Sequence, residues 1–159
     1  MESNLSITEF RDKLKKFTKI GHPKLKLSPF AMFSMFGDSS KIFYGLYDNS
    51  TFSLTSNFIA NPTSFILRGG YKTVNGKLKI QYKVTPRFKY QLYWWIFVPV
   101  LGFSFFNYTL LSNYNESSME KLIIINSFLI FMIVYAYFDI TRKKRKLEKN
   151  FIKIFEIIE

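Results

Sequence analysis

Two long uncharged stretches in the second half of the sequence constrain its fold more than any other feature. Residues 92–111 contain no charged side chain in 20 positions, and residues 122–138 contain none in 17. As helices, stretches of this length approach the thickness of the hydrocarbon core of a bilayer, about 30 Å. They predict transmembrane helices at residues 90–112 and 121–140, joined by an external loop at residues 113–120.

The charges around these stretches predict their orientation. The link between them is short and net negative, whereas Arg87 and Lys89 precede the first stretch and five consecutive basic residues follow the second. Basic residues collect on the cytoplasmic side of membrane helices. We therefore expect a multi-pass protein of the inner (cytoplasmic) membrane with both termini in the cytoplasm. The basic cluster that would anchor the second helix is Arg142, Lys143, Lys144, Arg145 and Lys146.

The composition excludes several classes of function. The chain has 159 residues, a net charge of +12 and no cysteine, so it has neither a disulfide framework nor a thiolate zinc site. Its single histidine, His22, cannot form a site that needs two imidazoles. The acidic residues among residues 1–89 are scattered, without the spacing of a catalytic dyad or a metal cluster. We expect no catalytic residues, no metal and no cofactor, and a protein that is not an enzyme.

Residues 1–89 are predicted to fold into a cytoplasmic head. A capping-box pattern opens an amphipathic helix that we place at residues 7–19. After it the apolar residues alternate with period two, at residues 41–47, 51–55 and 65–85. The expected fold class is α+β: an N-terminal helix and a small antiparallel sheet of about four strands, followed by a two-helix transmembrane hairpin.

The clearest local signal is a β-hairpin around Asn75 and Gly76. This pair is preferred in two-residue type I′ turns, because both positions need a positive φ. The turn fixes the register, so that the basic residues of the two strands share one face and oppose one another. Five cations without an acidic neighbour predict a surface for anionic lipid or for a partner, with simple solvation as the alternative. They are Arg68, Lys72, Lys77, Lys79 and Lys83, with Arg68 opposite Lys83 and Lys72 opposite Lys79.

The last segment, residues 141–159, is typical of a basic amphipathic cytoplasmic tail. Its apolar residues fall on one helical stripe and its lysines lie elsewhere. We expect the tail either to continue the second membrane helix as one helix or to break from it and lie on the lipid headgroups. The stripe consists of Leu147, Phe151, Ile154, Phe155 and Ile158.

Polar side chains inside the predicted membrane helices indicate contacts between helices. Asn107 and Asn126 can hydrogen-bond across helices in lipid, where little else competes for polar groups. We expect them to hold the hairpin or a dimer together, with a pore lining as the alternative.

The order of these features is similar to that of a family of small, largely uncharacterised bacterial membrane proteins of the Flavobacterium type. The similarity is carried by the sequences KIFYGLY at 41–47, FSLT at 52–55, GGY at 69–71 and LKIQYKVTP at 78–86, and it covers about residues 5–112. The resemblance implies a short helix and a small β-domain before two membrane helices, and a bacterial origin. It implies no activity.

These observations predict a non-enzymatic accessory or interaction subunit of the bacterial inner membrane. Its basic head would bind anionic lipid headgroups or a partner, and the chain would form a homo-oligomer or join a membrane-protein partner. The alternative is a ligand-sensing membrane effector that oligomerises to perturb or permeabilise the bilayer. Nucleic acid is not an expected partner. The positive charge of the chain favours it, but the head shows neither a recognition helix nor a set of stacking aromatic residues.

Overall fold

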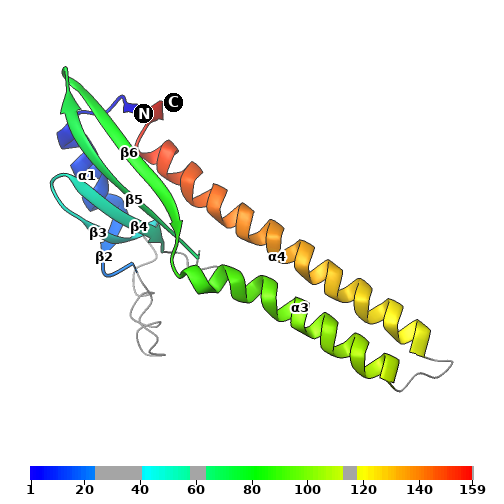
Figure 1. The fold of residues 1–159 in the computed structure, drawn as a ribbon. Coiled ribbons are helices and arrows are strands. Elements are labelled where there is room, and N and C mark those ends of the chain that lie inside the picture. The colour runs from blue at the N-terminus through cyan, green and yellow to red at the C-terminus, as the bar shows by residue number, and fades with distance from the viewer. Residues whose placement is uncertain (24–40, 58–63, 113–117, 159) are drawn as a thin grey trace. The chain divides into compact units, whose positions relative to one another are not determined.

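The computed structural model describes residues 1–23, 41–57, 64–112 and 118–158 (Figure 1). Within them, a short strand lies near each end of the chain and the longer elements lie between. The described elements are β1 (Glu2–Ser3), α1 (Ile7–Phe17), β2 (Thr18–Ile20), β3 (Phe43–Tyr47), β4 (Thr51–Ser56), β5 (Phe65–Val74), β6 (Lys77–Pro86), α3 (Lys89–Ser112), α4 (Ser118–Ile154) and β7 (Ile157–Ile158).

The chain divides into two compact units. Unit 1 combines Met1–Arg87 with Lys143–Glu159, and unit 2 is Phe88–Arg142. Helix α4 crosses the boundary between them without a break, so that its first part belongs to unit 2 and its last turns belong to unit 1. The head is therefore a discontinuous domain, built from two stretches of sequence that unit 2 separates.

Unit 1 contains a seven-stranded sheet in the order β2-β3-β4-β5-β6-β1-β7. Strand β2 is parallel to β3, whereas all other neighbours in this sheet are antiparallel. The strands predicted at residues 41–47 and 51–55 are present as β3 and β4, but the prediction of an antiparallel sheet of about four strands is wrong. The strands that it omitted, β1, β2 and β7, are two or three residues long. Segments this short carry no alternating pattern.

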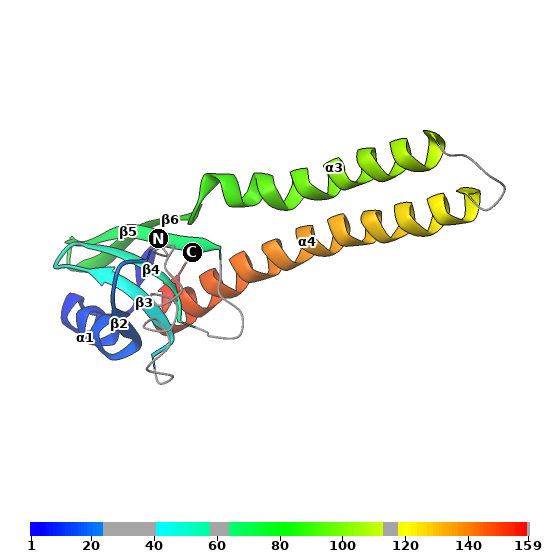
Figure 2. The ribbon, with the colours of Figure 1, turned by 90° about the horizontal axis from the view of Figure 1, so that it is seen from below.

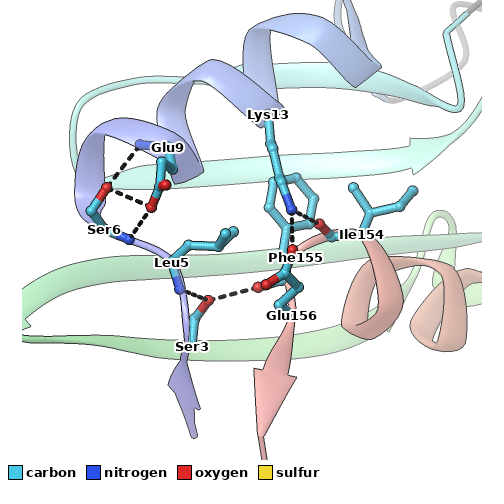
Figure 3. Close-up of polar contacts among 8 residues, drawn as sticks. All are labelled: Ser3, Leu5, Ser6, Glu9, Lys13, Ile154, Phe155 and Glu156. Atoms are coloured by element: carbon cyan, nitrogen blue, oxygen red, sulfur yellow. Dashed lines mark hydrogen bonds and ion pairs between the residues drawn. The ribbon is translucent and has the colours of Figure 1, made fainter.

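Local chemistry determines where α1 begins and ends. Ser6 is the N-cap: the Glu9 N–H donates to Ser6 Oγ (3.3 Å) and the Ser6 N–H donates to Glu9 Oε2 (2.8 Å), which completes the predicted capping box (Figure 3). The helix ends at Phe17, earlier than predicted. Thr18 is already extended, with φ −113° and ψ 127°, and it begins β2. Strand pairing with β3 thus shortens the helix.

The core of unit 1 lies on one face of the sheet, which α1 and the last turns of α4 cover (Figure 2). The ring of Phe10 in α1 lies 4.7 Å from that of Phe155, and the Phe155 ring lies 4.8 Å from that of Phe151. All three side chains are fully buried. The predicted continuous helix is thus confirmed through Ile154, but the alternative of a tail on the headgroups is wrong. Other buried members of this core are Leu14, Phe43, Phe52, Leu54, Tyr71, Leu78, Ile80 and Leu147.

Hydrogen bonds also join the two stretches of sequence that form unit 1 (Figure 3). Ser3 Oγ donates to the Phe155 carbonyl (2.6 Å), and Lys13 Nζ donates to the Ile154 carbonyl (3.1 Å) and pairs with the Glu156 carboxylate (2.5 Å). Strand β1 pairs with β6 on one side and with β7 on the other. The predicted stripe therefore packs against protein at Leu147, Phe151 and Phe155, whereas Ile158 is 52% exposed.

Unit 2 contains α3 and the first part of α4. In the described chain one helical stretch, Met119–Ile154, is long and apolar enough to cross a membrane, and the apolar stretch of α3 described here, Phe97–Ser112, is shorter. The predicted two-helix transmembrane hairpin, and with it the predicted fold class, is therefore wrong. Residues 113–117 of the predicted loop lie outside the described residues.

Unit 2 carries its large apolar side chains on the outside. The exposed fraction is 65% for Phe105, 68% for Ile124 and 61% for Phe131. Soluble monomers rarely expose apolar surface over such an extent, and a large patch marks a membrane or protein contact. Further exposed members are Tyr93, Trp94, Phe97, Leu101, Phe106, Leu111, Ile123, Phe128, Ile130, Val134 and Phe138.

Candidate functional site

The hairpin of β5 and β6 has the predicted register. Asn75 and Gly76 form its turn with positive φ angles of 53° and 75°. The ladder runs without a bulge from the turn to the far end of both strands. It places the basic side chains in opposed pairs on one face: Arg68 with Lys83, Lys72 with Lys79, and Lys77 opposite Val74.

We refer to Arg68, Lys72, Lys77, Lys79 and Lys83 as the cationic face. All five residues are exposed, and their register places them on the side of the sheet opposite to the core. Like charges that oppose each other across strands destabilise a sheet. The face therefore has an electrostatic cost, which water or bound anions must offset.

One acidic residue lies on the cationic face, which corrects the prediction of five cations without an acidic neighbour. Glu2 of β1 lies opposite Lys79, and its carboxylate is 3.3 Å from Lys77 Nζ. Both partners of this ion pair are well exposed, so it contributes little to stability. The position of Glu2 on this face could not be predicted, because β1 is too short to leave a strand pattern in the sequence. Among the described residues, the other four cations form no ion pair.

The alternation of the cationic face continues past the end of β6 to Arg87. Its N–H donates to the Ser64 carbonyl (2.6 Å), which extends the β5–β6 ladder and places the Arg87 side chain on the same side as Lys83. Nη2 of Arg87 donates to Thr55 Oγ1 (2.8 Å), and the Thr55 hydroxyl donates to the Phe65 carbonyl (2.8 Å). Unlike the residues of the cationic face, Arg87 and Thr55 are buried: Arg87 is 4% exposed and Thr55 is 0% exposed.

Burial leaves the Arg87 guanidinium short of hydrogen-bond partners. Its Nε and Nη1 atoms are buried and have no partner. Burial lowers the pKa of Arg87, an effect that the charge interaction with Tyr44 partly opposes. In the sequence, Arg87 is recognisable only as a charge that flanks an apolar stretch. Its two-residue spacing from the β6 lysines could have placed it on this face, but no sequence pattern could have shown its burial.

The basic cluster at residues 142–146 lies on α4 where unit 2 ends and unit 1 begins. Four of its members are exposed and Lys143 is half-buried. A few residues further along the same helix, Phe151 is buried in the core. The cluster therefore separates the exposed apolar surface of α4 from the part that is buried in protein.

Asn107 of α3 and Asn126 of α4 contact each other within unit 2. Asn107 Nδ2 donates to Asn126 Oδ1 (2.8 Å), and Asn126 Nδ2 donates to Asn107 Oδ1 (3.0 Å). Asn107 Nδ2 also donates to the Phe103 carbonyl (2.7 Å) in its own helix. The two amides thus satisfy each other within one chain and fix the pairing of the two helices.

A pocket of about 380 Å³ is lined by residues of β3 and β4 and by Asp48, Arg68 and Gly69. Its carboxylate, Asp48, accepts hydrogen bonds from the Thr51 hydroxyl (2.6 Å) and from the N–H groups of Ser50 (2.8 Å) and Thr51 (2.7 Å), which lower its pKa to about 2. Such a carboxylate stays ionised at neutral pH and is a poor general acid or base. In the described part of the chain, no group of three or more histidine, aspartate or glutamate residues could hold a metal ion.

Comparison with known proteins gives no precedent for this site. No protein-family model matches the sequence, and no curated protein or solved structure matches it significantly. A function must therefore be argued from the residues themselves. The features available are the cationic face, the buried Arg87 and the exposed apolar surface of unit 2.

Proposed function

We propose that this chain is a non-enzymatic, membrane-attached interaction protein whose cationic face binds anionic lipid headgroups. In this proposal the exposed apolar surface of unit 2 contacts lipid, and unit 1 lies at the membrane surface with its cationic face toward the headgroups. The cationic face carries the proposal: it holds five exposed basic side chains, and in the described chain Glu2 is the one acidic residue among them.

The exposed apolar surface of unit 2 supports attachment to a membrane. Large apolar side chains project outward from both of its helices, where water would solvate them poorly. Aromatic residues gather toward the ends of the apolar stretches, with Tyr90 and Trp94 at one end and Tyr137 near another. Tyrosine and tryptophan are enriched at the headgroup level of bilayers.

The basic cluster at residues 142–146 supports a cytoplasmic position for the head. Basic residues next to an apolar helix favour the cytoplasmic side of a membrane. Since residues 143–158 and 1–87 belong to one compact unit, the cluster supports the same side for the whole of unit 1. The resemblance to small bacterial membrane proteins favours the inner membrane of a bacterium.

The size of the electrostatic effect is sufficient for the proposed role. Each basic residue close to an anionic leaflet contributes about 1 kcal/mol. Five such residues on one face could hold the head firmly against headgroups. The attraction weakens with salt, since the Debye length is about 8 Å at physiological ionic strength.

Lysine reactivity in nanodiscs would test the proposal. The full-length chain is reconstituted in neutral phosphatidylcholine discs and in discs that also contain phosphatidylglycerol, and acylation of each lysine by a water-soluble ester is measured by mass spectrometry. We expect Lys72, Lys79 and Lys83 to be labelled several-fold more slowly in the anionic discs. Lys15 is an internal control, because it is exposed on α1, which covers the opposite face of the sheet.

A charge-reversed variant sharpens this experiment. Lys72→Glu combined with Lys79→Glu should remove the protection of Lys83 in anionic discs, and high salt should remove it from the wild-type chain. Equal labelling of the face in both kinds of disc, at low salt, would show that these residues are only solvated. The proposed headgroup binding would then be wrong.

The continuity of α4 favours a second candidate function, a ligand-sensing membrane effector. One helix carries both the exposed apolar surface of unit 2 and the buried Phe151 of unit 1, and the buried Phe155 follows directly after it, so a rearrangement of the head core would act directly on α4. Expression of the chain in bacteria with a dye that reports membrane potential separates the two functions. Depolarisation that disappears in a Phe155→Ala variant would favour the effector, and an unchanged potential would favour the interaction protein.

A further inference from the structure

The guanidinium of Arg87 is buried, and most of its hydrogen-bonding capacity is unused in the described chain. It holds one side-chain hydrogen bond, from Nη2 to Thr55 Oγ1, while Nε and Nη1 are buried without a partner. Within the part of the chain that the structure describes, Arg87 forms neither an ion pair nor a cation–π contact. The guanidinium is therefore a buried charge that lacks a counter-charge.

An arrangement of this kind is costly unless an anion completes it. A buried charge that lacks a partner costs several kcal/mol, and unsatisfied buried polar groups in folded proteins commonly mark a bound ion or water. Arginine stays protonated and presents a planar set of N–H donors that fits oxyanions such as phosphate. Thr55 acts as a positioning residue, because its hydroxyl accepts from Nη2 and is itself held by the Phe65 carbonyl.

The surroundings favour a highly charged anion. Arg87 continues the row of basic residues formed by Lys79 and Lys83 on β6, so the potential along this face is positive as far as the site.

We propose that Arg87 is the centre of a binding site for a phosphate group, with Thr55 orienting its guanidinium. The phosphate belongs either to a lipid headgroup or to a free phosphate compound. Arg87 is the last residue of unit 1 and directly precedes unit 2 in the chain, so a headgroup is a reachable source. This inference goes beyond the proposed function, because free phosphate would fill the site whether or not the cationic face binds a membrane.

Thermal unfolding of the full-length chain in a neutral detergent tests the site. Unfolding is followed in sodium phosphate and in sodium chloride of equal ionic strength, for the wild type and for Arg87→Met. Phosphate stabilises many proteins nonspecifically, so the informative quantity is the difference between the two proteins. We expect saturating phosphate to raise the Tm of the wild type by about 5 °C more than that of Arg87→Met.

Two comparisons guard against a variant that merely folds badly. In chloride, Arg87→Met should be at least as stable as the wild type, because methionine removes a buried charge that has no counter-ion. Arg87→Lys keeps the charge but loses the planar donor set, and it should retain only a small part of the response. Lys15→Met, an exposed change on α1, should leave the full response. An equal phosphate response in the wild type and in Arg87→Met would overturn the site.

Nanodiscs distinguish the two sources of the phosphate. If the site holds a headgroup, discs that contain phosphatidic acid should stabilise the wild type over Arg87→Met without added phosphate, and free phosphate should add little. If it holds a free phosphate compound, the lipid composition should not matter. The Lys72→Glu, Lys79→Glu variant should keep the phosphate response in detergent, so a failure of headgroup binding by the cationic face can be told apart from a failure of the Arg87 site.

Discussion

The two units of this chain treat the same kind of side chain in opposite ways. Phe155, near the end of α4, is fully buried, and Phe131, on α4 itself, is 61% exposed. In unit 1 a sheet and a second helix surround the apolar residues, whereas in unit 2 they face outward. The difference teaches that an apolar stripe shows which side chains avoid water, but it does not show whether protein or lipid receives them.

We expect the largest effect when the stretch of unit 1 that follows unit 2 in the sequence is removed. A chain that stops after Arg142 lacks Leu147, Phe151 and Phe155, and the partner strand β7. We expect its head to lose cooperative unfolding and to become sensitive to trypsin within residues 1–87. Residues 1–89 expressed alone should behave in the same way. If either protein keeps a folded, protease-resistant head, then the C-terminal residues are an accessory to the core and the two units are less different than we argue.

A matched pair of substitutions, one on α4 and one directly after it, gives the next largest effect. Phe155→Ala removes a fully buried ring from unit 1 and should cost about 3–5 kcal/mol of unfolding free energy. Phe131→Ala makes the same chemical change on an exposed ring of unit 2 and should change the stability of the head by less than about 0.5 kcal/mol. Chemical denaturation of the full-length chain in detergent measures both values. Equal losses from the two variants would contradict the comparison.

A double-mutant cycle measures the polar contact that unit 2 does contain. Asn107→Leu, Asn126→Leu and the double variant isolate the reciprocal hydrogen bonds between α3 and α4. Such contacts between helices in a membrane are worth about 0.6 kcal/mol on average. We expect a coupling energy of that size, with the head unaffected. Hydrogen exchange of α3 and α4 in nanodiscs provides the readout, and additive effects of the two single changes would show that the contact carries no energy.

The smallest expected effect is a change in how the stability of unit 1 depends on pH in acid. The pKa of Asp48 is lowered to about 2 by the Thr51 hydroxyl and by the N–H groups of Ser50 and Thr51, from an ordinary value of 3.8. Its contribution to stability is therefore fully present above about pH 4 and is lost as the pH falls toward 2. Asp48→Asn should make the Tm of the head less dependent on pH in that window, and an unaltered pH profile would show that the turn is insensitive to this charge.

The parts of the fold that sequence alone could predict are those fixed by local chemistry. The Asn75-Gly76 turn determined the register of β5 and β6, and Ser6 with Glu9 determined the start of α1. The parts that escaped prediction depend on distant residues. The tail showed its apolar stripe, but a lipid surface and a sheet satisfy such a stripe equally well, so burial of Phe155 against Phe10 could not be foreseen.

The same division holds for the candidate site. The opposed pairs of the cationic face follow from the turn, and they are present as predicted. Glu2 reaches this face through the pairing of β1 with β6, and Arg87 becomes buried through contacts with Thr55 and Ser64, which are remote from it in sequence. Pairing of two-residue strands and burial of single charges leave no periodic trace in a sequence.

The insertion of unit 2 into the sequence of unit 1 has a consequence for synthesis on the ribosome. Residues 1–87 are translated first, but the phenylalanines that complete their core come only after residues 88–142. At about 5–20 residues per second, translation of that interval takes several seconds, longer than small domains generally need to fold. During this time the inner faces of Phe10 and Phe43 have no partner from the tail. The head therefore matures only after unit 2 has been made, and the nascent chain passes through an interval in which chaperones have an apolar surface to bind.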